Sequence, residues 1–191
     1  MKTSAVVDFK QNETVQWESK TEDFPLLAPG VRFSIFLKWI LTVVIFGGFL
    51  TGYGISNGGV NPWFCGACIL IALLIILSPF WERRNALRCR YMITDQRILL
   101  SVGNKTPYYI DLVKLDGCKV ITDRSGKKSL LFGSCLFNSK EKQLRWQTVH
   151  PKTDLQANNT DGSVIGLIFY YPEKLDAAVS LLKLLGKKVE E

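Results

Sequence analysis

The chain has 191 residues, of which 47% are hydrophobic, and its formal net charge is +7. A mean hydropathy of +0.11 is high for a soluble protein and low for a transporter with many spans, so we expect a membrane anchor joined to a water-exposed domain. The five cysteines have irregular spacings, which argues against a secreted disulfide framework.

Residues 1–32 are polar or mixed, and they do not resemble a cleavable signal peptide because the first apolar run begins only after them. Val15 and Trp17 alternate with polar neighbours, which is the period of a strand. We expect this segment to be cytoplasmic and to add a short strand or arm to the C-terminal domain.

Two apolar runs, residues 33–53 and 63–81, are each long enough to cross a hydrocarbon core of about 30 Å as a helix. Only the uncharged residues 54–62 separate them, so residues 33–81 should form an antiparallel transmembrane hairpin. The one charged residue of the hairpin is Lys38, whose long stem can carry its ammonium back to the headgroups.

Two glycines of the first span, Gly48 and Gly52, have the spacing that lets helix backbones approach closely. We favour packing of this pair against the second helix of the hairpin. Association between copies of the chain is the alternative.

Cys65 and Cys68 form a C-x-x-C pattern at the outer end of the second span. Two thiols one helical turn apart near an oxidising compartment can cycle as a redox pair. Cysteine is also a common small apolar residue in membrane helices, and we favour this second interpretation.

Four arginines follow the second span within nine positions: Arg83, Arg84, Arg88 and Arg90. The positive-inside bias places this end, and therefore both termini, in the cytoplasm. The same arginines are the candidate lipid-binding residues, because topology holds them near anionic headgroups. Determination of topology alone would also account for them.

The C-terminal domain, residues 82–191, carries the whole net charge of +7. Apolar residues alternate with polar ones from Leu87 onward, which is typical of half-buried strands. An apolar stripe after Pro172, ended by Gly186, predicts a helix that covers the β structure. We predict seven strands in a barrel or sandwich, at residues 87–93, 97–102, 108–112, 118–122, 128–132, 144–149 and 164–170.

The stretch from Tyr91 to Leu100 contains Thr94 and Arg97 in a pattern similar to the opening of the bacterial pleckstrin-homology-like domains of the YdbS/YdbT type. The run from Ile165 to Leu175 resembles the final strand and helix of that family. The resemblance covers roughly residues 85–186 and implies an α+β membrane protein whose seven-stranded, helix-capped PH-like domain follows two spans. It implies no single activity. Departures are the Tyr170-Tyr171 pair and the polar stretch from His150 to Gly162.

The turn from Thr94 to Arg97 is explained by Thr and Asp side chains that bond local backbone amides, without a ligand. The patterns GxSxG, GxxxxGK[ST], GxGxxG and HExxH are missing, and His150 is the only histidine. We therefore expect no enzymatic activity, cofactor or metal.

The favoured function is a non-enzymatic adaptor or scaffold at the bacterial inner membrane, whose domain binds a protein partner or its own copies and touches anionic lipids generically. We expect no nucleic-acid partner. The alternative is a small thiol-redox membrane protein that uses Cys65 and Cys68.

Overall fold

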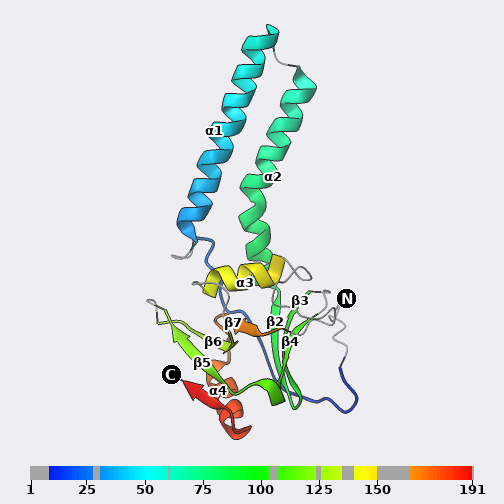
Figure 1. Ribbon diagram of the computed structural model, residues 1–191, viewed down its shortest axis with the longest axis vertical. Coiled ribbons are helices and arrows are strands. Elements are labelled where there is room, and N and C mark those ends of the chain that lie inside the picture. Colours follow the sequence, from blue (N-terminus) through cyan, green and yellow to red (C-terminus); the bar gives the residue numbers. More distant parts are fainter. Residues whose placement is uncertain are drawn as a thin grey trace. The chain divides into compact units, whose positions relative to one another are not determined.

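A computed structural model describes residues 9–27, 31–59, 61–103, 107–123, 126–134, 140–149 and 164–190. The chain forms two compact units (Figure 1). One combines Met1–Phe24 with Arg84–Glu191, and the other is Pro25–Arg83. His150 and Cys135 lie outside the described residues.

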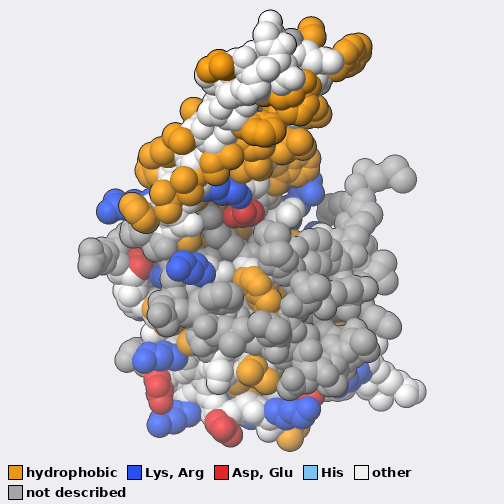
Figure 2. All heavy atoms as spheres, turned by 45° about the horizontal axis from the view of Figure 1, so that its top comes forward, with side chains coloured by type: hydrophobic (Ala, Val, Ile, Leu, Met, Phe, Trp, Pro, Cys, Tyr) orange, Lys and Arg blue, Asp and Glu red, His pale blue; other side chains and the backbone are white. Residues whose placement is uncertain are grey.

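Two long helices, α1 (Arg32–Asn57) and α2 (Pro62–Ala86), contain the two predicted spans. Both are long enough and apolar enough to cross a membrane, and only 11% of each apolar window is buried. Figure 2 shows hydrophobic side chains gathered along much of the visible surface of the two helices. Helix α1 continues to Asn57, four residues into the predicted turn, and ends at Gly58, whose φ of 64° suits a left-handed cap.

The two helices contact each other through polar and aromatic side chains. Lys38 Nζ donates to Ser78 Oγ at 2.6 Å, so this ammonium has a partner on the neighbouring helix. The indole of Trp39 donates to the Ile76 carbonyl at 3.1 Å. Nearer the turn, the ring of Phe64 lies 4.6 Å from that of Tyr53, centroid to centroid.

The first sheet has the order β1-β2-β3-β4, and all neighbours in it are antiparallel. Its first strand comes from the N-terminal segment and pairs with the strand that follows α2, which confirms the expected arm. The strands are β1 (Val15–Lys20), β2 (Cys89–Thr94), β3 (Arg97–Val102) and β4 (Tyr108–Asp111).

The second sheet has the order β7-β6-β5-β8, with β8 parallel to β5. The two four-stranded sheets do not form a closed barrel, contrary to one form of the prediction. A short 3₁₀ helix, η1 (Leu112–Lys114), connects the sheets. The strands are β5 (Gly117–Thr122), β6 (Lys128–Gly133), β7 (Gly166–Phe169) and β8 (Lys188–Glu190).

The strand predicted at residues 144–149 is wrong, because these residues belong to helix α3 (Lys140–Val149). The described side chains that it buries fully are Gln143, Leu144 and Gln147, whose spacing of three and four is helical. Two of the three are polar, so hydrophobic periodicity did not reveal this face.

The predicted C-terminal helix is present as α4 (Leu175–Leu184), which buries Ala178 and Leu182. It begins three residues after Pro172, since Pro172 instead forms a β-bridge with Thr21. Gly186, with a φ of 72°, follows the helix end as expected.

Aromatic rings occupy the centre of the domain. The ring of Phe169 lies 4.6 Å from that of Tyr91, 4.8 Å from that of Phe132 and 5.8 Å from that of Trp17. The other face of the first sheet is also apolar, because Met92, Leu99 and Tyr109 form a second buried cluster there. Strands β2 and β3 are therefore more deeply buried than their alternation predicted.

Candidate functional site

The four predicted lipid-binding arginines lie consecutively along the chain. Arg83 and Arg84 occupy the last turn of α2, Arg88 the turn that follows, and Arg90 the second position of β2. Arg84 and Arg88 are exposed. Arg90 is less available, because its guanidinium lies 3.7 Å from the Glu18 carboxylate on β1.

The strands on either side of the hairpin are hydrogen-bonded neighbours. Strand β1 precedes α1, β2 follows α2, and Ser19 stands opposite Tyr91 in the antiparallel register. The domain therefore includes chain from both sides of the hairpin. Arg88 and Arg90 are fixed at the point where the chain re-enters this sheet.

A buried ion pair anchors the start of the N-terminal segment. Arg97 Nη2 lies 2.5 Å from Glu13 Oε2, and Arg97 Nε donates to Glu13 Oε1 at 3.0 Å. The Glu13 and Arg97 side chains are 0% and 7% exposed. We call Glu13, Thr94 and Arg97 the N-terminal clamp.

Burial alone would raise the pKa of the Glu13 carboxyl. Hydrogen bonds from Arg97, Thr94 and the Lys10 amide outweigh burial and lower its pKa to about 2. The pKa of the Arg97 guanidinium is raised, chiefly by its hydrogen bond to Glu13. Both groups are therefore charged at neutral pH.

Thr94 organises the turn that carries Arg97. Its Oγ1 accepts from the amides of Gln96 and Arg97 at 3.2 and 2.8 Å, which confirms the predicted local role of this hydroxyl. It also lies 2.7 Å from Glu13 Oε1. The carboxylate of Asp95 accepts instead from the Thr14 amide, in the N-terminal segment. The turn therefore binds the N-terminal segment through these hydrogen bonds.

The phenol of Tyr91 joins the N-terminal segment to the second sheet. Its oxygen lies 2.6 Å from Thr21 Oγ1, donates to the Tyr170 carbonyl and accepts from the Tyr170 amide. Complete burial raises the pKa of Tyr91 well above its usual value. This hydroxyl is a neutral structural group.

Tyr171 holds the next part of the N-terminal segment. Its carbonyl accepts from the Glu22 amide at 2.8 Å, and its hydroxyl donates to the Asp123 carboxylate. Lys140 Nζ lies 4.7 Å from the centroid of its ring. A φ of 44° is unusual for a residue other than glycine. The Tyr170-Tyr171 pair, a departure from the resembled family, thus has a packing role here.

The predicted glycine pair does not pack within the hairpin. A Cβ added at Gly48 or Gly52 would meet no heavy atom within 4 Å. The structure therefore shows no close contact of these two glycines with α2, and the contacts between the helices are made by aromatic and polar side chains elsewhere on α1. Association between copies through these glycines stays a prediction.

The cysteines differ in environment. Cys65 and Cys68 are both free thiols on α2, the first half-buried and the second buried. On β5, burial raises the pKa of Cys118 to about 11, although the charge of Lys183 opposes this. The Cys118 thiol is therefore protonated at neutral pH and is a poor nucleophile.

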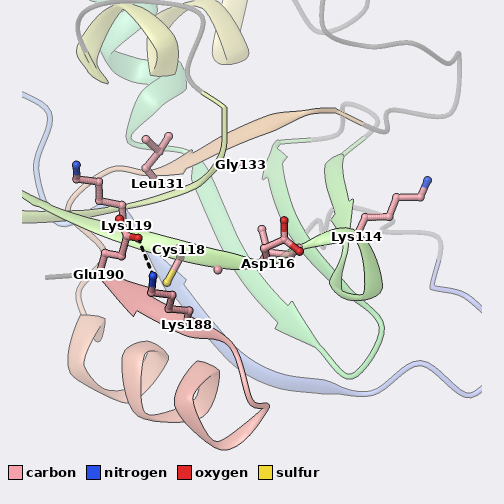
Figure 3. A pocket seen from close by; sticks show the side chains of 10 residues that line it. Lys114, Asp116, Cys118, Lys119, Leu131, Gly133, Lys188 and Glu190 are labelled. Carbon is pink, nitrogen blue, oxygen red and sulfur yellow. Dashed lines mark ion pairs between the residues drawn. The ribbon is translucent and has the colours of Figure 1, made fainter.

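An open pocket of about 450 Å³ lies on the second sheet and η1 (Figure 3). Lys114, Lys119 and Lys188 contribute to its lining. Lys114 and Lys119 extend in opposite directions, and Lys188 pairs with Glu190 (Figure 3). These cations do not converge on one anion. Within the described residues, no group of three or more His, Cys, Asp or Glu side chains is arranged to hold a metal.

The chain matches no family model, no curated protein and no solved structure. Sequence reasoning missed Glu13 and the Tyr91 network. Their contacts join positions 84 and 79 residues apart, so no local pattern marks them. The Tyr170-Tyr171 pair, a departure from the resembled family, was the one sequence feature that pointed to the Tyr91 network.

Proposed function

We propose that the chain is a membrane-anchored, non-enzymatic adaptor or scaffold. Helices α1 and α2 anchor it, and its two-sheet domain binds a protein partner or further copies of the chain while touching anionic lipids generically. The location is the bacterial inner membrane, with both termini in the cytoplasm. A relation to the bacterial PH-like proteins is part of this proposal and is supported by the Thr94 and Arg97 pattern.

The pairing of β1 with β2 is the observation that carries the proposal. A domain built from chain on both sides of a hairpin stays next to the membrane surface. The predicted span ends at residue 81, and Arg84 lies three residues further along α2, a rise of about 4.5 Å at roughly 1.5 Å per residue. That distance is shorter than the Debye length of about 8 Å in physiological salt, so the exposed Arg84 side chain would be attracted by anionic headgroups.

A hairpin-deleted chain, with Phe24 joined to Arg84 by a flexible linker, tests the lipid contact. It must retain β1, because Arg97 would otherwise lose its partner Glu13. After its cooperative unfolding is established, it should bind anionic vesicles weakly in co-sedimentation and be released between about 0.05 and about 0.5 M salt.

Replacing Arg84 and Arg88 with Glu should abolish this binding, because both side chains are exposed. The matched control is Lys114→Glu together with Lys128→Glu, which changes the net charge equally at other exposed sites. Salt-resistant binding to one headgroup would overturn the generic contact. Equal losses in both double variants would show that only net charge matters.

A further inference from the structure

Strand β8 forms an outer edge of the second sheet (Figure 1). It pairs in parallel with β5, with Lys188 opposite Gly117 and Glu190 opposite Lys119. Among the described residues, no strand pairs with its other side. Edge strands present backbone amides and carbonyls that a further strand can bind.

The side chains of β8 have different roles. Val189 packs partly against the core. Lys188 and Glu190 are 79% and 56% exposed, and their charged atoms are 3.5 Å apart on one face of the strand. This ion pair is drawn in Figure 3. The edge therefore offers one positive and one negative group, two positions apart.

The sequence Lys188-Val189-Glu190 is complementary to itself. If a second β8 aligns antiparallel about Val189, each Lys188 stands opposite Glu190 of the other copy. Directly opposed unlike charges stabilise a strand pair and like charges destabilise it. Parallel alignment in register would oppose like charges. The complementary pairing has the twofold symmetry expected of a homodimer.

We infer that two copies of the chain associate through the β8 edges, antiparallel about Val189, so that the second sheet continues across the dimer. A purely acidic partner fits this edge less well, because it would oppose Glu190 with a like charge. A lysine without a nearby acidic residue would disfavour pairing at the strand edge. Here Glu190, two positions later, can pair with Lys188 of the second copy.

The inference rests on the proposed membrane anchoring. An edge of three residues buries far less than the roughly 1,200 Å² of a stable interface in solution. Confinement to a bilayer raises the effective concentration of one copy around another. The dimer is therefore expected in membranes and not in dilute detergent.

Energy transfer between donor- and acceptor-labelled full-length chains in liposomes tests the pairing. Lys188→Glu alone and Glu190→Lys alone should each weaken self-association by about tenfold, because each opposes like charges at both positions. Mixing the two variants should restore transfer, since each Glu at 188 or 190 then faces a Lys. The matched control is Lys128→Glu, an exposed change in the same sheet, which should keep wild-type transfer.

The rescue in trans separates pairing between copies from the ion pair within one copy. Unchanged transfer in either single variant, or no recovery in the mixture, would overturn the dimer. Vesicle binding of the hairpin-deleted chain is measured separately, so its failure would reject the lipid contact without rejecting the dimer.

Discussion

Glu13 and Arg97 form a salt bridge that is almost completely buried. Arg97→Ala should lower the free energy of unfolding by about 3–5 kcal/mol, because it leaves the Glu13 carboxylate buried without its cation. Thermal or urea unfolding of the full-length chain in detergent, followed by tryptophan fluorescence, measures this loss.

The matched control is Arg90→Ala, whose partner Glu18 is 48% exposed. Exposed ion pairs contribute less than about 1 kcal/mol. If Arg97→Ala destabilises the chain no more than Arg90→Ala, the clamp does not anchor the N-terminal segment.

The same carboxylate predicts a dependence of stability on pH. Its pKa is about 2 in the folded chain against an ordinary value of 4.5, so the folded state binds its proton less readily than the unfolded state. The resulting stability is complete above pH 4.5 and is lost as pH falls toward about 2.

Glu13→Gln removes this titration. The difference in unfolding free energy between wild type and Glu13→Gln should therefore shrink as pH falls through that window, and unfolding curves at a series of pH values measure it. A difference that stays constant would show that Glu13 has no depressed pKa.

At this scale, the sequence predicted local contacts and missed distant ones. The Thr94 turn was predicted because its hydroxyl bonds amides two and three residues away. Glu13 looked like an ordinary acidic residue, because its partner lies in a strand beyond the hairpin. The depth of Met92 was likewise hidden, since its neighbours in the buried cluster, Leu99 and Tyr109, lie on other strands of the sheet.

At the scale of the elements, the small-residue motif of the hairpin and the residues that join its two helices are different. Gly48→Ala and Gly52→Ala should leave its thermal stability unchanged or slightly higher, because the added methyl meets no neighbour and alanine favours helix. Trp39→Phe should lower the free energy of unfolding of the hairpin by about 1 kcal/mol, since the hydrogen bond to the Ile76 carbonyl is lost. Helix content during thermal melting, recorded by circular dichroism in detergent micelles, compares these variants. If Gly48→Ala or Gly52→Ala lowers the stability of the hairpin more than Trp39→Phe does, the glycines do pack closely against a neighbouring helix.

The amphipathic α4 and most of the strands were predicted because their apolar residues repeat with a clear period. Helix α3 was not, since Gln143 and Gln147 occupy its buried face and polar residues carry no hydrophobic period. The edge strand β8 was missed as well, because Lys188 and Glu190 are exposed and three residues are too few to show an alternating pattern.

For the whole molecule, the proposed topology places both ends of the chain in the cytoplasm. Alkaline phosphatase, active only outside the cytoplasm, should stay silent when fused after Glu191. The same enzyme inserted in the turn near Gly58 should be active, which provides the positive control. Activity after Glu191 would reverse the orientation and place Arg84 and Arg88 on the outer surface.

The position of the hairpin between two paired strands also sets the order of events during synthesis. Strand β1 leaves the ribosome first, but its partner β2 follows only after both helices. That interval lasts several seconds, since translation adds roughly 5–20 residues per second. During this interval Trp17 and Phe24 cannot pack into the core, and Glu13 cannot pair with Arg97. The domain therefore cannot close until the second helix has been made, and destabilised variants of β1 should delay closure only after that point.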